Sequence, residues 1–289
     1  RAGSAGHPEG GGEMSCDVAK LIDQARLLRR DVVNTVYLAK DGHPSPALSC
    51  ADIVAALFFE VLSIDPAKPK WEDRDRFVLS KGHACPVLYA ALARRGYFSR
   101  DELPGLRSLG SKLQGHPCMR KTVGIDMTSG SLGNGVSIGV GMAIAGKYQK
   151  KDYYTYVITG DGELGEGIVW EAAMSAAKHK LGKLIVFVDN NGLQSGGRIE
   201  EVGGVTPILE KWQAFRWHCQ EIDGHNMEQI LAAIAAAKLE TERPSMILAH
   251  TVKGKGIPYM EKDNAWHKKV PTDAEWREAM ELLGGIDGE

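Results

Sequence analysis

The spacing of hydrophobic and polar residues along the chain predicts alternating helices and strands. From residue 18 to 38 apolar side chains recur at helical spacing, and Asp17 can cap the start of this helix. A second helix is expected over residues 51–62. Residues 76–96 predict a short strand, a loop and a helix that Gly96 ends.

The centre of the chain has the clearest pattern. Residues 153–159 (YYTYVIT) and 183–189 (KLIVFVD) are apolar runs typical of buried strands, and residues 167–180 between them have helical spacing. A further helix over 225–240 and a buried strand over 245–252 follow. Such alternation predicts an α/β fold, with a parallel sheet covered by helices on both faces.

The most apolar long stretch, residues 131–146, contains Asn134, Ser137 and five glycines and is short for a membrane span. We therefore expect residues 132–147 to form a helix of the soluble fold. Because glycine costs roughly 1 kcal/mol inside a helix, these glycines are expected to permit close backbone packing.

Domain organisation follows from the ends of the pattern. The glycine-rich start lacks any apolar pattern, so we expect residues 1–14 to be a disordered extension and residues 15–289 to form one domain. The net charge of −2 gives no reason to expect nucleic acid or an anionic membrane as partner. Five scattered cysteines without a C-x-x-C pair favour a reducing cytoplasm over a disulfide framework.

Residues 160–165 (GDGELG) fit the dinucleotide-binding pattern G-x-G-x-x-G, but they carry two carboxylates, Asp161 and Glu163. In a nicotinamide-binding site the glycine amides would hold the pyrophosphate, and Asp189 would supply the acid for the ribose. Two carboxylates would repel a diphosphate, whereas a divalent metal between them would reverse that sign. Metal-mediated diphosphate binding is therefore the better interpretation, and Glu163 is expected at a helix N-terminus, where its charge is favourable.

Two strand ends support the metal interpretation. One expected strand runs into Asp161 and the next into Asp189-Asn190-Asn191. Right-handed crossover brings both ends to one edge of the sheet, so a carboxylate, an amide oxygen and nearby backbone carbonyls converge there. Hard oxygen ligands of this kind suit Mg²⁺ or Ca²⁺.

Four histidines lie in expected loops and add candidate proton-transfer groups: His43, His83, His116 and His267. A lone histidine is more often structural, but an imidazole near neutrality can move protons or donate to substrate hydroxyls. Lys81 and Lys253 stand in neighbouring loops, where they are either simply exposed or paired with a diphosphate. The glycine-rich loop 128–135 is either a flexible connection or a place where a flat cofactor ring approaches the backbone.

The ordered motifs resemble the transketolase family. Gly160-Asp161-Gly162 followed by Asn191, which is 30 positions after Asp161, is similar to the thiamine diphosphate motif. The strings DGHP, LSKGHACPVLYAAL, QGHP, TSGSLGNG, GDGELGEGIVWEA, DNNGL, IDGHN and KGKGI…AWH come in transketolase order over about residues 17–280.

The resemblance implies a thiamine diphosphate-binding fold and a set of site residues. Asp161, the Asn191 side chain and the Leu193 carbonyl would hold Mg²⁺ or Ca²⁺. The remaining cofactor contacts would come from Lys81, His83, Gly130, Ser131, Leu132, Gly162, Lys253 and His267. The catalytic groups would be His43, His83, His116 and His267 in the substrate channel, with Glu166 as the acid that links two active sites.

The resemblance also implies a partner. Full transketolases have three domains, and this sequence resembles only the first, without the pyrimidine-binding domain and its catalytic glutamate. We therefore expect the N-terminal subunit of a split transketolase, active only with a separate C-terminal subunit, in an α₂β₂ assembly. It would transfer a two-carbon ketol unit from a ketose to an aldose, usually as phosphates. Pro46, close to His43, departs from the family pattern and is expected to alter the channel there.

Three alternatives remain open from the sequence. One is a subunit of another thiamine diphosphate enzyme, of the decarboxylase or 2-oxoacid dehydrogenase type. The second is a nicotinamide-binding oxidoreductase, and the third is a non-catalytic binding subunit.

Overall fold

A five-stranded parallel sheet forms the centre of the computed structural model, which describes residues 17–285. The strands are β1 (Arg76–Leu79), β2 (Thr155–Gly160), β3 (Leu184–Asn190), β6 (His218–Asp223) and β7 (Ser245–His250), in the spatial order β1-β2-β3-β7-β6. The predicted α/β class and parallel sheet are confirmed. The expected disordered extension over residues 1–14 lies outside the described residues.

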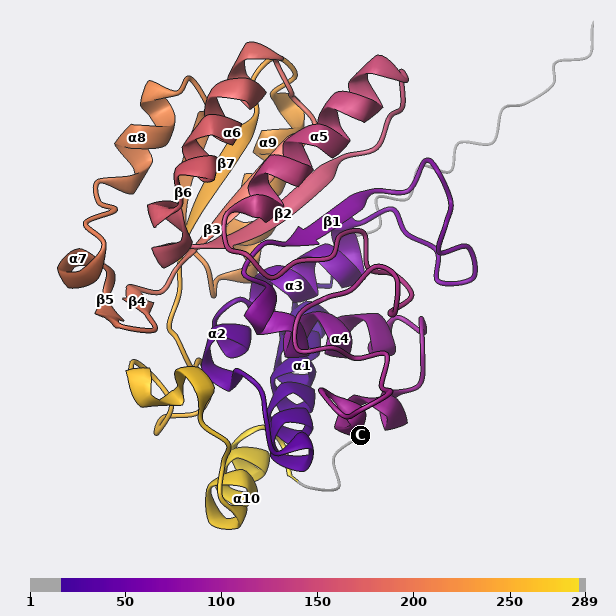
Figure 1. The fold of residues 1–289 in the computed structure, drawn as a ribbon, viewed down its shortest axis with the longest axis vertical. Coiled ribbons are helices and arrows are strands. Elements are labelled where there is room, and N and C mark those ends of the chain that lie inside the picture. The colour runs from indigo at the N-terminus through magenta and orange to yellow at the C-terminus, as the bar shows by residue number, and fades with distance from the viewer. Residues whose placement is uncertain (1–16, 286–289) are drawn as a thin grey trace, which may run out of the picture.

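Helices cover both faces of this sheet (Figure 1). Their bounds are α1 (Val18–Ala39), α2 (Pro44–Ser49), α3 (Ala51–Ala56), α4 (Cys85–Arg94), α5 (Asn134–Tyr148), α6 (Gly167–Lys178), α7 (Ile199–Val202), α8 (Ile208–Ala214), α9 (Met227–Leu239) and α10 (Asp273–Leu282). Short turns of helix follow α3 as η1 (Leu57–Val61) and stand at η2 (Gly82–Ala84), η3 (Arg100–Gly105), η4 (Gly162–Gly165) and η5 (Asn264–Lys268). A small hairpin, β4 (Leu193–Gln194) and β5 (Gly197–Arg198), follows β3.

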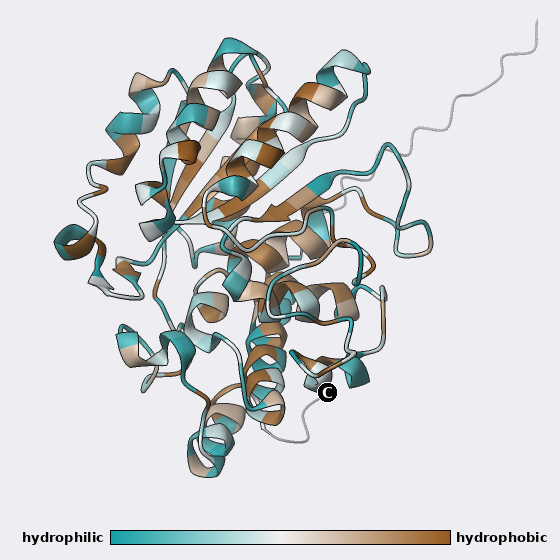
Figure 2. Ribbon diagram, viewed as in Figure 1, coloured by the Kyte–Doolittle hydropathy of each residue, from teal (hydrophilic) through white to brown (hydrophobic). Residues whose placement is uncertain are grey.

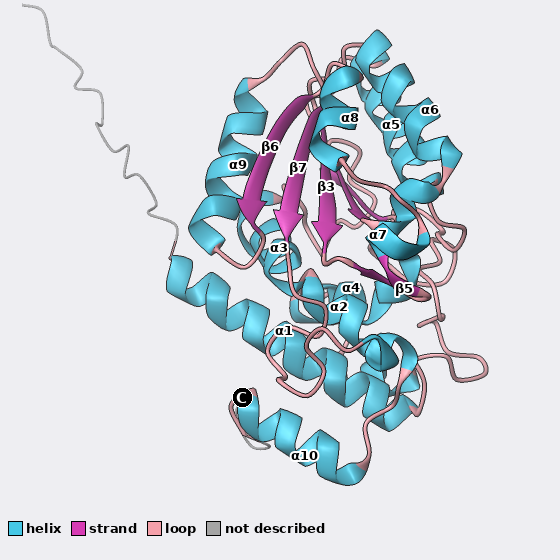
Figure 3. Ribbon diagram, turned by 90° about the vertical axis from the view of Figure 1, so that its left-hand side faces the viewer, coloured by secondary structure: helices cyan, strands magenta, loops and turns pink. Residues whose placement is uncertain are grey.

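Alternate residues of each central strand enter two separate apolar layers. Tyr156 and Ile158 belong to the layer packed by α1, α3, α4 and α9, while Val157 between them belongs to the layer packed by α5, α6 and α8. Figure 3 shows β6, β7 and β3 side by side, with α9 on one side of them and α5 and α6 on the other. Because both faces are buried, the strands read as continuous apolar runs, which explains the hydrophobic centre in Figure 2.

The packing of α5 explains its glycines. A Cβ built on Gly135 would lie 2.4 Å from Ser80 Cβ, and one on Gly139 would lie 2.6 Å from Val157 Cγ2. The first two turns of α5 therefore pack so close to the sheet that a side chain at these positions would clash, as the sequence predicts. Gly141 meets nothing within 4 Å, so its lack of a side chain has no packing reason inside this chain.

The first and last helices of the described chain pack against each other. Helix α10 packs along α1 (Figure 1), and the rings of Tyr37 and Trp276 stack with their centroids 4.6 Å apart. Asp17 accepts a hydrogen bond from the Lys20 amide, so the predicted cap of α1 is confirmed. Among residues 17–285, no helix combines the length and apolar character that crossing a membrane requires.

Candidate active site

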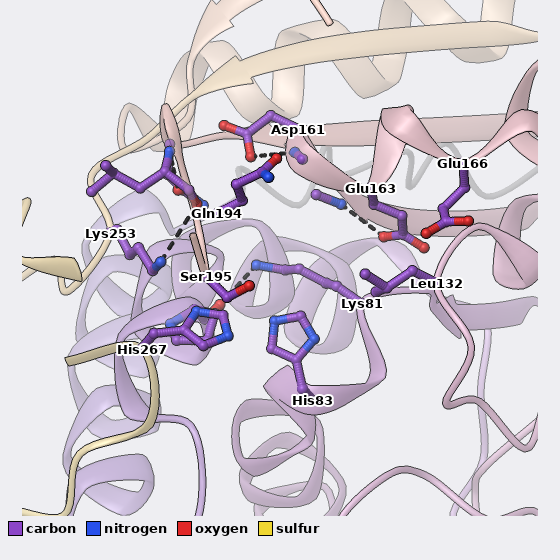
Figure 4. Close-up of a pocket in the computed structure, with 15 residues that line it drawn as sticks. Lys81, His83, Leu132, Asp161, Glu163, Glu166, Gln194, Ser195, Lys253 and His267 are labelled. Atoms are coloured by element: carbon purple, nitrogen blue, oxygen red, sulfur yellow. Dashed lines mark hydrogen bonds between the residues drawn. The ribbon is translucent and has the colours of Figure 1, made fainter. Parts of the chain in front are cut away.

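A cavity of about 280 Å³ opens at the carboxyl ends of β1, β2, β3 and β7 (Figure 4). Parallel pairing sets the strand ends level, since Gly160 of β2 lies opposite Asp189 of β3. The loops that follow these strands therefore meet in one place, which is where ligands bind in open α/β sheets. The lining includes Lys81, Leu132, Asp161, Glu166, Asn191 and Lys253, all of them sequence candidates.

The three expected metal ligands lie together on one side of the cavity. Asp161 Oδ1 accepts from the Gly162 amide at 2.7 Å, and Oδ2 accepts from the Gly192 amide at 2.6 Å. The Gly192 contact ties the β2 loop to the turn that carries Asn191 and Leu193. In that turn Asn191 Oδ1 accepts from the Leu193 amide at 3.1 Å.

The chemistry of this oxygen set fits a divalent cation. Asp161 is only 2% exposed, and no lysine or arginine of residues 17–285 forms a salt bridge with it. Burial, together with the nearby charge of Asp189, raises the pKa of Asp161 to about 6. Lys81 and Lys253 act on this carboxylate from a distance but form no salt bridge with it, so a bound metal ion would supply the counter-charge in direct contact.

Lys253 is the cation that faces the same pocket. It is 1% exposed, and its ammonium donates to Asn264 Oδ1 at 2.8 Å and to the Leu193 carbonyl at 3.4 Å. Burial lowers the pKa of Lys253 to about 8. Because its partners are neutral oxygens, the ammonium group is available to an anion such as a diphosphate.

Lys81 has a different environment from Lys253. Its ammonium group contacts the Asp189 carboxylate and donates to the Pro46 carbonyl at 2.7 Å. Asp189 is fully buried and also accepts from the Ser49 and Thr251 hydroxyls. The ribose role considered for Asp189 is therefore wrong, because its carboxylate is enclosed and fully engaged by protein groups.

Three of the four candidate histidines come together from distant parts of the sequence, with His83 and His267 in the lining of the cavity and His43 packed against both. The ring centroids of His43, His83 and His267 are 5.3, 5.4 and 5.2 Å apart, pair by pair. His43 precedes α2, whereas His83 and His267 stand in the short helical turns η2 and η5. The expectation of plain loops was wrong in this detail.

These imidazoles are neutral hydrogen-bonding groups. Burial lowers the pKa of His43 and of His267 to about 4 and that of His83 to about 2, with smaller contributions from neighbouring cationic groups. Nδ1 of His43 and Nδ1 of His267 are buried without a hydrogen-bond partner in the described structure. Unpaired polar atoms in such a place are suited to a ligand.

Glu166 lines the cavity, whereas His116 is not among the residues that line it. A Cβ on Gly82 would meet the His116 ring at 3.4 Å, which places this ring beside η2, and burial lowers its pKa. Glu166 lines the rim with an exposed side chain. The loop of Gly130, Ser131 and Leu132 contributes Leu132 to the lining, and Gly130 faces open space.

The structure adds residues that sequence reasoning missed. Gln194 and Ser195 line the cavity from the β4–β5 hairpin, and a Cβ on Gly162 would lie 2.7 Å from Gln194 Cβ. Their position directly after the DNNGL string was the available signal. Ser49 and Thr251 had none, because their contacts with Asp189 span 140 and 62 positions.

Comparisons with known proteins agree with this geometry. Residues 18–287 match the family model described as "Transketolase, thiamine diphosphate binding domain". A 6-deoxy-6-sulfo-D-fructose transketolase subunit from Clostridium sp. (strain MSTE9) is 45% identical over 270 residues, which are 93% of this chain and 98% of the relative. An apulose-4-phosphate transketolase subunit from Phocaeicola vulgatus is 42% identical over 257 residues, which are 89% of this chain and 91% of the relative.

A solved structure shows the same fold. The transketolase from Leishmania mexicana superposes with a TM-score of 0.85 at 33% identity, over 93% of this chain but only 42% of that one. This chain therefore matches the relatives named as subunits over nearly their whole length, but it matches less than half of the Leishmania transketolase.

Proposed function

Because this chain belongs to the transketolase family, we propose that it is the diphosphate-binding subunit of a two-subunit enzyme that transfers a two-carbon ketol unit from a ketose to an aldose. The observation that carries the proposal is the convergence of Asp161, Asn191, Leu193 and Lys253 with His83 and His267 around one cavity, where His43 packs against both histidine rings. The relatives named as transketolase subunits, which this chain covers almost completely, support the two-subunit arrangement.

The residues present would hold the cofactor in a definite way. The Asp161 carboxylate, the Asn191 side-chain oxygen and the Leu193 carbonyl would bind Mg²⁺. Lys253 would neutralise part of the diphosphate charge, while Gly162 and the Gly130–Leu132 loop allow close approach of the backbone. Thiamine diphosphate, when bound, supplies the centre that stabilises the carbanion during two-carbon transfer.

The histidines act on the sugar. His43, His83 and His267 are neutral at physiological pH, so each ring can donate one hydrogen bond and accept another. Rings with this capacity can orient the substrate hydroxyls and carry a proton to or from the carbonyl oxygen. His116, beside η2, would contact the substrate farther along the same channel.

The substrate is proposed to be an anionic ketose. The Clostridium relative is named for a sulfonated ketose and the Phocaeicola relative for a phosphorylated one. In this chain Arg107 and Lys268 both pair with Asp41, at 3.0 and 3.8 Å, so two cations share one carboxylate beside His43, and their charges contribute to its low pKa. Cationic side chains near the first histidine favour an anionic group on the sugar.

The second subunit is proposed to contact the face formed by α5 and α6, together with another copy of this chain, in an α₂β₂ assembly. Ile138 of α5 is 40% exposed and Met174 of α6 is 53% exposed. Helix α5 is apolar around its whole circumference, and such a helix is normally buried on all sides. Glu166, exposed at the rim of the cavity beside α6, would then lie at the contact between copies.

The test is reconstitution with a transketolase C-terminal subunit that carries the pyrimidine domain. We expect two-carbon transfer from 6-deoxy-6-sulfofructose or apulose 4-phosphate to an aldose only when both chains, Mg²⁺ and thiamine diphosphate are present. Fructose serves as the neutral control donor. Turnover of 2-oxoacids instead, or activity that NAD⁺ supports without thiamine diphosphate, would refute the proposal.

A further inference from the structure

Glu163 is the carboxylate of the GDGELG loop that the proposed metal site does not use. It stands in the turn η4, two residues after Asp161, and its side chain is 3% exposed. The expectation of a mainly helix-terminal role was incomplete, because the carboxyl group points inward. In the described part of the chain no lysine or arginine forms a salt bridge with it.

Three hydrogen bonds satisfy this buried group. Oε1 accepts from the Ser80 hydroxyl and from the Gly133 amide, the latter at 2.6 Å. Oε2 accepts from the Gly160 amide at 3.0 Å. Both carboxylate oxygens are therefore engaged by donors, and two of the three donors are backbone groups.

The three donors come from different segments around the cavity. Ser80 follows the last residue of β1 and precedes Lys81. Gly133 follows Leu132 at the start of α5, and Gly160 is the last residue of β2 before Asp161. One side chain thus connects the segment that precedes the buried lysine, the loop that contributes Leu132 to the cavity and the loop of the proposed metal ligand. Figure 4 shows Glu163 in the pocket together with Lys81, Leu132 and Asp161.

The backbone around Gly133, which donates to Glu163, is closely packed. Gly133 has a φ of +80°, and a Cβ on it would lie 2.8 Å from Glu166 Cβ and 2.7 Å from Ile168 Cγ2. The backbone at Gly133 is therefore pressed against the residues that form the rim of the cavity. A shift of the Glu163 contact would move Leu132 and Glu166 relative to Asp161.

Glutamine cannot replace this glutamate without loss. Its amide offers one acceptor oxygen and a donor NH₂ group. If the oxygen faces Ser80 and Gly133, the NH₂ group faces the Gly160 amide. In the opposite orientation it faces the Gly133 amide, which lies only 2.6 Å from the present oxygen. Either way one backbone donor loses its acceptor inside the protein.

We propose that Glu163 is a positioning residue, which holds the Gly130–Gly133 loop and the Asp161 loop in the geometry that accepts thiamine diphosphate with its metal. This inference rests on the proposed function of the cavity. It assigns Glu163 to cofactor affinity rather than to metal binding or to proton transfer.

The experiment measures the dissociation constant of thiamine diphosphate, in the presence of Mg²⁺, for the complex with the partner subunit. Calorimetry follows binding, and thermal unfolding of the cofactor-free complex follows stability. For Glu163→Gln we expect the dissociation constant to rise roughly tenfold or more, the effect of losing a hydrogen bond to a charged group. Ser80→Ala removes one of the three donors and should also raise the dissociation constant, by a smaller factor.

Tyr153→Phe is the matched control. It removes the partly buried hydrogen bond, 2.9 Å long, that the Tyr153 hydroxyl donates to the Met142 carbonyl. This bond lies near the amino end of β2, away from the cavity. Tyr153→Phe should lower the thermal midpoint but leave the dissociation constant unchanged. A merely structural role for Glu163 would produce that same pattern.

The outcomes separate the two proposals. If the wild-type complex does not bind thiamine diphosphate with Mg²⁺, the proposed function and this inference fall together. If the wild type binds and Glu163→Gln binds equally tightly, only the inference is overturned. Should Glu163→Gln fail to fold, Ser80→Ala decides, because an unchanged dissociation constant there also overturns the inference.

Discussion

The ammonium group of Lys81 contacts the carboxylate of Asp189 in the protein interior, although the two residues stand 108 positions apart. Lys81 is 3% exposed and Asp189 is fully buried. Despite burial, which acts in the opposite direction, the Asp189 charge holds the pKa of Lys81 above its usual value, and Lys81 holds the pKa of Asp189 below its usual value. Both side chains are therefore charged in the folded chain, and the pair links the end of β1 to the end of β3 beneath the cavity.

Lys81→Met should destabilise the chain strongly, because it leaves the Asp189 charge buried without a partner. Removing one member of a buried ion pair costs about 3–5 kcal/mol. The free energy of unfolding, measured by urea denaturation, checks this. The control is Lys183→Met, which removes an exposed, solvent-screened pair with Asp152 and should cost far less. Equal losses for the two variants would show that the buried pair has no special role.

The glycines of α5 allow a comparison within one helix. Gly135→Ala places a methyl group 2.4 Å from Ser80 Cβ and 2.6 Å from Ser80 Cα, so the helix must move away from β1. We expect a loss of roughly 1–3 kcal/mol, typical of overpacking. Gly141→Ala meets nothing within 4 Å and should instead stabilise the isolated chain by up to about 1 kcal/mol, the helix propensity difference. Thermal unfolding of both variants tests the close approach, which a gain for Gly135→Ala would disprove.

The histidine cluster predicts how stability depends on pH. In the folded, cofactor-free chain the pKa of His43 and of His267 is about 4, whereas an unfolded histidine has its ordinary value of 6.5. Between these values the unfolded chain binds more protons, so this contribution to stability is present above pH 6.5 and is lost as the pH falls toward 4.

Urea denaturation at pH 7, 6 and 5 measures this loss. His83 has the lowest pKa of the three, so it contributes to the loss of stability as the pH falls. The His83→Gln variant lacks this contribution, and its free energy of unfolding should fall less than that of the wild type between pH 7 and 5. The comparison is needed because the raised pKa of Asp161 acts in the opposite direction. If the free energy of unfolding fell equally with pH in the variant and in the wild type, the cluster would not titrate as described.

The central βαβ unit was predictable because its strands are buried on both faces. The apolar runs over 153–159 and 183–189 differ from β2 and β3 by no more than two residues at either end. Strand β6 was not predicted, because as an edge strand it is only partly buried and reads as the polar string HCQEID. Helix α10 was also missed, although Thr272 and Glu275 form the capping box that the sequence pattern offers.

Some residues of the candidate site could also be placed from the sequence, and others could not. Asp161 and Asn191 could be placed from the sequence, since each follows a recognisable strand and parallel strands end at one edge. The convergence of His43, His83 and His267 depends on the packing of α2, η2 and η5, which no spacing rule gives. The partners of Glu163 are beyond sequence reasoning for the same reason, because Ser80 and Gly133 reach it from separate loops.

The central claim is that Asp161 binds a metal ion and that the metal ion binds the diphosphate. The most direct measurement is a calorimetric titration of thiamine diphosphate into the two-subunit complex, with Mg²⁺ or with EDTA, for the wild type, Asp161→Asn and the exposed control Asp101→Asn. Binding should require Mg²⁺ in the wild type and in Asp101→Asn, and Asp161→Asn should weaken it by roughly tenfold or more, since the loss of a charged ligand is worth more than about 1.4 kcal/mol. Equally tight binding in EDTA, or by Asp161→Asn, would contradict the account.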